Sequence, residues 1–283
     1  MNWPVDDWWQ PRRVALPDQT GLAVRLHEAD RTPIVLVHGL ASNALLWRDV
    51  AEGMAAQGHA VAAVDLRGHG RSDRPDGGYG TGQCAADVQA VVRTLGWTDR
   101  KPILAGQSWG GNVVVRAAAQ GDGWGGLLCV DGGWIYLRDR FSSFDQCWQA
   151  LAPPGFGDSP PDAVLRMIQE HLRGWPPSAL AAVMGNLEVV DGRVRNRLAF
   201  ERHRSIVHSL WSDSPVPDFP KVTCPAHLMV AGRDSSPDVD QAQALLSDAT
   251  VSWHVAAHHD IHLQHPELVI DHLKVLVSQV EGS

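Results

Sequence analysis

One serine of the chain lies between glycines, in the stretch Gly106-Gln-Ser-Trp-Gly110, which fits the pattern G-x-S-x-G. An apolar run at residues 103–105 precedes this stretch, and a helical pattern over 112–120 follows it. Such a stretch is typical of a sharp turn from strand to helix that exposes the serine hydroxyl at the end of the strand. Ser108 is therefore the candidate nucleophile.

A nucleophilic serine needs a general base, and the base needs an acid that orients it. Asp234 follows the apolar run 226–230, and His259 lies just after the run 251–255. Ser108, Asp234 and His259 thus come in the chain order Ser…Asp…His, each just past a predicted strand. Side chains at the carboxyl ends of parallel strands gather at one edge of a sheet. The three residues together predict acyl-transfer chemistry.

The tetrahedral intermediate of such chemistry carries a negative charge that backbone amides stabilise. A helix that starts at Trp109 would direct the Trp109 amide at this charge. A second amide is expected from the loop His38-Gly-Leu40, which follows the apolar run 33–37. Leu40 and Trp109 are therefore the predicted oxyanion donors.

These residues require elements that hold them in place. Strand patterns at 33–37, 60–64, 103–105 and 126–130 alternate with helical patterns, which predicts an α/β fold with a mostly parallel sheet. The alternation breaks between residues 132 and 220, which contain three Pro-Pro pairs and helical stretches, and it resumes at 226. We expect residues 1–131 and 221–283 to form the core domain, with 132–220 inserted as a helical cap or lid.

The chain resembles the α/β-hydrolase superfamily, in particular its small capped members with a serine nucleophile. Four motifs carry the resemblance: His38-Gly39, the D-x-R-G-x-G-x-S stretch at residues 65–72, the G-x-S-x-G stretch at 106–110, and His259 seven residues before Pro266. The resemblance covers nearly the whole chain and implies the α/β-hydrolase fold, with residues 132–220 as a variable cap. The fold itself hosts many activities and does not identify a substrate.

The resemblance also implies roles for single residues. Ser108 is the expected nucleophile, and the spacing to Pro266 selects His259 as the base among the histidines that crowd this loop. Asp234 is the favoured acid, and Asp131, directly after the run 126–130, is the alternative. The loop 65–73 is expected to brace the site, with Arg67 and His69 structural. A serine rather than an aspartate nucleophile argues against the epoxide-hydrolase and dehalogenase branches.

Twelve tryptophans suggest an aromatic wall for an apolar substrate. The candidate pocket residues are His38, Trp134, Trp148 and Trp211. Trp175, in the predicted cap, and Trp109, beside the serine, are further tryptophans that could contribute their indole rings to this wall.

Composition excludes several kinds of partner. The net charge is −8, which is the opposite of a nucleic-acid-binding surface. The four cysteines form no C-x-x-C pair, and the histidines near residue 259 lack a helical H-E-x-x-H pattern, so neither a disulfide framework nor a metal site is expected. With no signal-peptide pattern and no long apolar window, we expect a cytoplasmic protein, monomer or homodimer, without membrane partner or cofactor.

The sequence thus predicts a serine hydrolase that cleaves a carboxylic ester or lactone of a largely apolar small molecule through an acyl-enzyme. The same residues would also support C–C bond hydrolysis or perhydrolysis. A ligand-binding protein that keeps this fold with little turnover is the alternative of another class.

Overall fold

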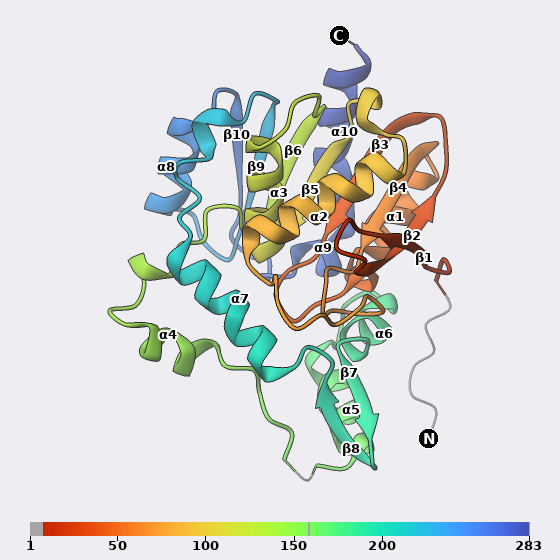
Figure 1. The fold of residues 1–283 in the computed structure, drawn as a ribbon, viewed down its shortest axis with the longest axis vertical. Helices are drawn as coiled ribbons and strands as arrows, with labels where there is room; N and C mark the ends of the chain where they lie inside the picture. The colour runs from red at the N-terminus through yellow and green to blue at the C-terminus, as the bar shows by residue number, and fades with distance from the viewer. Residues whose placement is uncertain (1–7, 158, 283) are drawn as a thin grey trace.

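The computed structural model describes residues 8–157 and 159–282. Its centre is an eight-stranded sheet of order β1-β2-β4-β3-β5-β6-β9-β10 (Figure 1). β2 pairs antiparallel with β1 and β4, and every other pair of neighbours is parallel. The predicted α/β class with a mostly parallel sheet is therefore confirmed. The strands are β1 (Arg12–Ala15), β2 (Gly21–His27), β3 (Arg31–Val37), β4 (His59–Val64), β5 (Ile103–Gln107), β6 (Gly126–Val130), β9 (Ala226–Ala231) and β10 (Ala249–His254).

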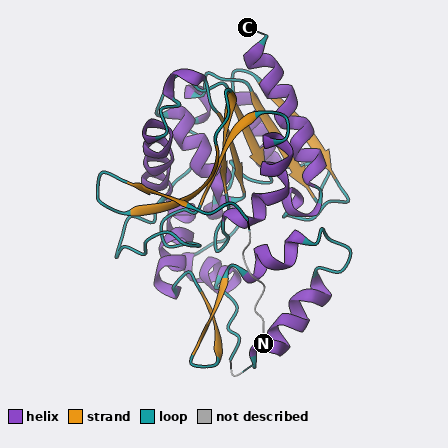
Figure 2. Cartoon of the chain, turned by 90° about the vertical axis from the view of Figure 1, so that its right-hand side faces the viewer, coloured by secondary structure: helices purple, strands orange, loops and turns teal. Residues whose placement is uncertain are grey.

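Helices cover both faces of this sheet (Figure 2). Successive side chains of a strand point to opposite faces, which explains why β3 is apolar at consecutive positions. Val35 and Val37 belong to the layer that contains α2 (Thr81–Thr94), α3 (Trp109–Ala119) and α8 (Pro237–Leu245). The side chains of Ile34 and Leu36 belong to the opposite layer, with α1 (Arg48–Ala55) and α10 (Pro266–Glu281). The sheet is thus buried on both sides and presents its side chains for chemistry only at its ends.

Residues 132–220 leave the sheet after β6 and return to it before β9. We call them the inserted segment; they lie toward the bottom of Figure 1, where the β7–β8 hairpin projects away from the sheet. The helical stretches predicted here are present, together with a two-stranded hairpin. The elements are α4 (Phe144–Leu151), α5 (Pro161–His171), α6 (Ser178–Met184), β7 (Leu187–Val190), β8 (Arg193–Asn196) and α7 (Phe200–Ser212). The predicted division into two domains at 131 and 221 stays a prediction.

Several short helical turns complete the fold. They are α9 (Ile261–Gln264) and the 3-10 turns η1 (Ala44–Trp47), η2 (Thr98–Arg100), η3 (Leu137–Asp139) and η4 (Phe219–Lys221). Across residues 8–157 and 159–282, the helices are too short or too polar to cross a membrane. All four cysteines are buried free thiols.

Candidate active site

Ser108 occupies the single residue between the end of β5 and the start of α3. Its φ is 53°, a positive value that residues other than glycine rarely adopt. The flanking glycines allow this turn, because a Cβ on Gly106 would lie 2.2 Å from the Gly110 carbonyl oxygen. A Cβ on Gly110 would lie 2.5 Å from the backbone oxygens of Val37 and His38. The structure therefore gives Ser108 the strained strand-to-helix turn that its motif predicts.

His259 is held by an aspartate from a neighbouring strand end. Its Nδ1 lies 2.6 Å from the Oδ2 of Asp131, which directly follows β6. The Asp131 side chain is only 5% exposed, whereas that of His259 is 47% exposed. A buried carboxylate at Nδ1 fixes the tautomer of the ring and leaves Nε2 as the nitrogen that can accept a proton.

The acid that the sequence favours, Asp234, is not the one that contacts the base. Asp234 is exposed, and its side chain makes no hydrogen bond or ion pair with the described residues. Arg233, one residue before it, turns inward instead and places its Nη2 2.8 Å from the Oδ1 of Asp131. β6 and β9 are neighbouring parallel strands, so both aspartates follow strands at the same edge of the sheet. The turn after Val130 directs Asp131, and not Asp234, toward His259. The alternative acid, Asp131, occupies the geometric position that was expected of Asp234.

The Asp131 carboxylate is surrounded by donors. Its Oδ1 accepts the Ala231 amide at 3.2 Å in addition to the Arg233 guanidinium. Burial acts to raise the pKa of Asp131, but the His259 hydrogen bond and these donors outweigh it and hold the pKa below its ordinary value. The side chain is therefore an ionised carboxylate at neutral pH.

Opposing effects act on the pKa of the His259 imidazole. Burial lowers its pKa, whereas the Asp131 hydrogen bond and the charges of Asp260 and Asp131 raise it, and the Arg233 charge lowers it again. The pKa of His259 consequently lies above its ordinary value of 6.5. The raised pKa strengthens His259 as a proton acceptor, which is the role of a general base.

A cavity of about 270 Å³, which we call the serine cavity, contains both Ser108 and His259 in its wall. The wall mixes apolar and polar side chains, and both kinds come from the core and from the inserted segment. Its apolar members include Leu46, Leu172, Trp175 and Val183, and its polar members include Ser42, Gln107, His171 and Asn186. The cavity is therefore suited to a small substrate with both apolar and polar parts.

The predicted oxyanion donors lie on either side of the serine. Leu40 lines the serine cavity together with Ser108. The loop that carries Leu40 touches the nucleophile turn, because a Cβ on Gly39 would lie 3.0 Å from the Ser108 Cβ. Trp109 is the first residue of α3, where backbone N–H groups have no partner within the helix. The donor roles of the Leu40 and Trp109 amides remain predictions, which this proximity supports.

Two predicted pocket residues beside the serine are instead buried in the core. His38 is fully buried; its Nδ1 lies 2.7 Å from the Gly39 oxygen, and its Nε2 accepts the Leu66 amide at 3.0 Å. The Trp109 indole is also fully buried and donates to Thr81 Oγ1 at 3.1 Å. Both rings hold loops and helices together and do not line the serine cavity.

Three of the tryptophans predicted to line the pocket also lie elsewhere. Trp134 is buried, Trp148 packs edge-on against Phe200, and Trp211 lies under the Arg138 guanidinium. Trp175 is the tryptophan that lines the serine cavity. Sequence alone gives no periodicity in this part of the inserted segment that would distinguish Trp175 from the others.

The loop 65–73 braces the site, as expected. The Asp65 carboxylate accepts the amides of Ala44 at 2.7 Å and Arg71 at 2.9 Å, which ties this loop to the turn after Leu40. His69 places its Nε2 3.3 Å from the Ala41 amide. Arg67 forms a buried ion pair with Asp87 at 2.6 Å.

The remaining histidines near the base have separate surroundings. His262 is fully buried against the Trp47 ring, and His258 packs on Trp175. In the part of the chain that the structure describes, no three histidine, cysteine, aspartate or glutamate side chains are grouped as metal ligands.

The sequence profile of the alpha/beta hydrolase family matches residues 34–272. The chain belongs to the alpha/beta hydrolase family. This α/β-hydrolase is 30% identical over 231 residues to N-formylmaleamate deformylase of Pseudomonas putida, which covers 78% of this chain and 79% of that one. A shorter match, to AB hydrolase superfamily protein YisY of Bacillus subtilis at 38% identity, spans 32% of this chain and 33% of the relative.

Solved structures share the whole fold. The crystal structure of E-2-(acetamidomethylene)succinate hydrolase has a TM-score of 0.77 and 23% identity, with 95% of this chain and 98% of that one covered. An esterase from Exiguobacterium antarcticum has a TM-score of 0.72 at 17% identity, over 95% and 99% of the two chains. The α/β-hydrolase fold that the motifs predict is thereby confirmed, and the chain is a member of a family of hydrolases.

Proposed function

We propose that this α/β-hydrolase is a serine hydrolase that cleaves a carboxylic ester or lactone of a small molecule through an acyl-enzyme. The observation that carries the proposal is the pairing of His259 with Asp131 in the wall of the cavity that also contains Ser108. A strained serine, a base and a buried carboxylate at one edge of a sheet are the parts that acyl transfer needs.

In the proposed reaction, the Ser108 hydroxyl adds to the substrate carbonyl while His259 Nε2 takes the hydroxyl proton. Asp131 stabilises the imidazolium that forms. The Leu40 and Trp109 amides stabilise the oxyanion, a contribution worth about 3–4 kcal/mol per donor in comparable sites.

Collapse of this intermediate breaks the bond to the alcohol, which leaves with the proton from His259. Water then loses a proton to His259 and attacks the acyl-serine, and the product acid is released as the Ser108 hydroxyl regains its proton. The partial exposure of the His259 side chain leaves room for this water.

Hydrolysis of an amide bond is the second candidate. A relative that matches over 78% of this chain is named N-formylmaleamate deformylase, and the same serine chemistry cleaves either bond. The polar half of the serine cavity, with Gln107 and Asn186, favours a substrate that is more polar than the largely apolar one expected from the tryptophan content.

Labelling with a fluorophosphonate probe, together with hydrolysis of p-nitrophenyl acetate, tests the serine mechanism. We expect the native enzyme to react with both and Ser108→Ala to react with neither while keeping its fold by circular dichroism. Equal p-nitrophenyl acetate hydrolysis by Ser108→Ala would overturn the mechanism. Absence of labelling in the native enzyme would favour a ligand-binding role instead.

A substrate panel with esters, lactones, N-formylmaleamate and a β-diketone identifies the bond that is cleaved. We expect the highest kcat/KM among the esters or lactones. A preference for N-formylmaleamate would establish the amide candidate, and a preference for the diketone would establish C–C hydrolysis.

A further inference from the structure

The end of the serine cavity formed by Ser42 and Asn186 is polar on both of its sides. Ser42 belongs to the core loop that also carries Leu40, and Asn186 belongs to the inserted segment, directly before β7. The two residues also line a second, smaller space of about 10 Å³. This volume is roughly that needed by one water-sized group, such as a single oxygen atom of a ligand.

The side chain of Asn186 is oriented by Asn43. Asn43 Oδ1 accepts the Leu45 amide at 2.8 Å, so its Nδ2 is the atom that faces Asn186. That Nδ2 donates to Asn186 Oδ1 at 2.5 Å and to the Ala182 oxygen at 2.9 Å. The Asn186 oxygen is therefore occupied, and its Nδ2 is left as a donor with no acceptor among the described residues.

Ser42 offers a second donor. Its side chain is nine-tenths buried, and its hydroxyl has no hydrogen-bond partner within the described residues. A buried hydroxyl without a partner costs free energy, about 1–3 kcal/mol by comparison with mutational data. Such a group in the wall of a binding cavity is explained when a ligand supplies the missing acceptor.

A positive charge lies next to these donors. Arg197 lines the small space together with Ser42 and Asn186. Its backbone amide donates to the backbone carbonyl oxygen of Asn186 at 2.9 Å, which closes the base of the β7–β8 hairpin. Its guanidinium has one ion-pair partner among the described residues, Glu188, at 3.6 Å. Arg74 makes two shorter contacts to the same Glu188 carboxylate, at 3.1 and 3.3 Å, so the Arg197 charge is only partly compensated.

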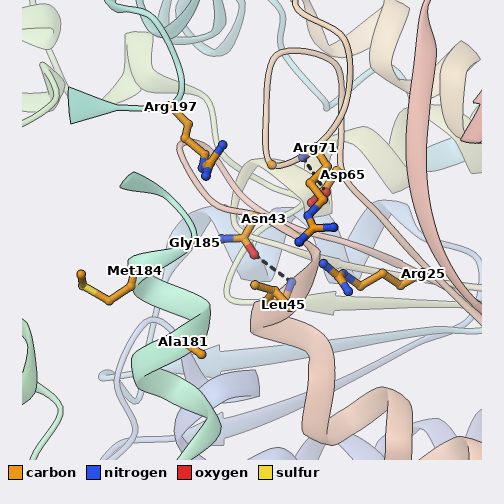
Figure 3. Close-up of a pocket in the computed structure, with 10 residues that line it drawn as sticks. Arg25, Asn43, Leu45, Asp65, Arg71, Ala181, Met184, Gly185 and Arg197 are labelled. Carbon is orange, nitrogen blue, oxygen red and sulfur yellow. Dashed lines mark hydrogen bonds between the residues drawn. The ribbon is translucent and has the colours of Figure 1, made fainter. Parts of the chain in front are cut away.

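Figure 3 shows Arg197 reaching from the inserted segment toward Asn43 and toward Arg71 on the core. These residues line an adjacent cavity of about 170 Å³ that shares Arg197 and Gly70 with the small space. The small space therefore shares Ser42 and Asn186 with the serine cavity and Arg197 with this adjacent cavity.

We propose that Ser42, Asn186 and Arg197 form a carboxylate-binding subsite, and that the substrate of Ser108 is a small ester or amide that carries a free carboxylate. This inference rests on the proposed serine hydrolase function. Two neutral donors without acceptors and one guanidinium match the acceptor-only chemistry of a carboxylate. A neutral alkyl group at this end would leave the Ser42 hydroxyl and the Asn186 Nδ2 without an acceptor, and the Arg197 charge only partly compensated by Glu188.

Three methyl esters of nearly equal length test the subsite. Monomethyl glutarate carries a carboxylate, methyl 5-oxohexanoate a neutral carbonyl, and methyl hexanoate no acceptor at the far end. We expect kcat/KM for monomethyl glutarate to exceed that for methyl hexanoate by about tenfold or more, as a charged hydrogen-bond acceptor warrants. Equal values for these two esters, or a preference for the neutral carbonyl, would overturn the carboxylate assignment.

Variants of the subsite residues test whether these residues cause the preference for monomethyl glutarate. Asn186→Leu, Asn186→Asp and Arg197→Met should each lower the glutarate-to-hexanoate ratio by about tenfold, and Ser42→Ala by about threefold. Arg195→Met is the matched control, since Arg195 is exposed two residues away on β8 and lines none of these cavities; its ratio should equal that of the native enzyme. A ratio that all four subsite variants leave unchanged would overturn the proposal.

Failure of this inference is distinguishable from failure of the serine mechanism. p-Nitrophenyl acetate carries no carboxylate, so its Ser108-dependent hydrolysis reports on the serine mechanism without the proposed carboxylate contact. Native hydrolysis of that ester, without any preference for monomethyl glutarate, would leave the serine mechanism standing and remove only the subsite.

Discussion

Asp131 and His259 are 128 residues apart in sequence, yet Asp131 Oδ2 lies 2.6 Å from His259 Nδ1. The other oxygen of the same carboxylate accepts from Arg233 at 2.8 Å and from the Ala231 amide at 3.2 Å. Asp131 is thus the shared partner of the base and of a guanidinium that belongs to the turn after β9. Its surroundings determine both the orientation and the proton affinity of His259.

Replacement of the two candidate acids distinguishes their roles. Asp131→Asn should reduce kcat for p-nitrophenyl acetate by about 10³–10⁴-fold, because the amide cannot stabilise the imidazolium or maintain its tautomer. Asp234→Asn should stay within about twofold of the native enzyme, because Asp234 is exposed and does not contact the base. Steady-state kinetics of the two purified variants provides the measurement. A larger loss in Asp234→Asn than in Asp131→Asn would restore the acid that the sequence favours.

Arg233 should influence the pH dependence of kcat/KM. His259 must be neutral to accept the serine proton, so kcat/KM rises with pH through a pKa above 6.5. The Arg233 charge lowers that pKa, so Arg233→Met should move the rising limb to higher pH, and Arg233→Lys should largely restore it. The measurement is the pH profile of kcat/KM. A variant that only disturbed the structure would lower kcat/KM without moving the rising limb to another pH.

Arg140→Met serves as the control for Arg233→Met. Arg140 pairs with Asp238 at 3.1 Å on the surface, and both side chains are about one-third exposed. Its pH profile should coincide with that of the native enzyme. A limb that moves equally in both variants, or to lower pH in Arg233→Met, would contradict the assigned effect of Arg233.

The core of the fold was predictable because each strand of the parallel sheet is an apolar run between turn residues. The run at 103–105 and the glycines at 106 and 110 describe the nucleophile turn almost completely, since only glycine fits where a Cβ would meet backbone atoms. His259 also follows from its motif. These features depend on residues that are near one another in sequence.

The acid and the pocket depend on the packing of distant segments, which motifs do not encode. Asp131 and Asp234 both follow strands at one edge of the sheet, and the choice between them depends on the turns after β6 and β9. Tryptophan content predicted an aromatic pocket, but Trp134, Trp148 and Trp211 pack elsewhere. Asn186 and Ser42 carry no motif and are recognisable only when their partners in space are known.

Glycine at position 106 should be indispensable to the fold. An alanine there would bring its Cβ within 2.2 Å of one backbone oxygen and 2.5 Å of a backbone carbon, neither of which can move independently of α3. We expect Gly106→Ala to lower the free energy of unfolding by about 3 kcal/mol or more. Gly77→Ala, where no atom lies within 4 Å of the new Cβ, should change it by less than about 0.5 kcal/mol. Urea denaturation followed by circular dichroism compares the two, and equal midpoints would contradict the close approach.

The ion pair between Arg67 and Asp87 should contribute to stability without taking part in the reaction. Asp87 Oδ2 lies 2.6 Å from Arg67 Nε and Oδ1 lies 2.7 Å from Nη2, with both side chains 2% exposed. Asp87→Ala would leave a buried guanidinium without its main partner and should lower the free energy of unfolding by about 3–5 kcal/mol.

The exposed pair of Asp162 and Arg166, at 2.7 Å, provides the comparison for Asp87→Ala. Asp162→Ala should cost less than about 1 kcal/mol, because solvent screens exposed charges. The kcat/KM of folded Asp87→Ala should stay within about threefold of native, since neither Arg67 nor Asp87 lines the serine cavity. Urea midpoints that fall by the same small amount in both variants would show that burial adds nothing to the Arg67 pair. A loss of kcat/KM beyond a hundredfold in folded Asp87→Ala would show instead that the loop 65–73 directly positions the reacting groups.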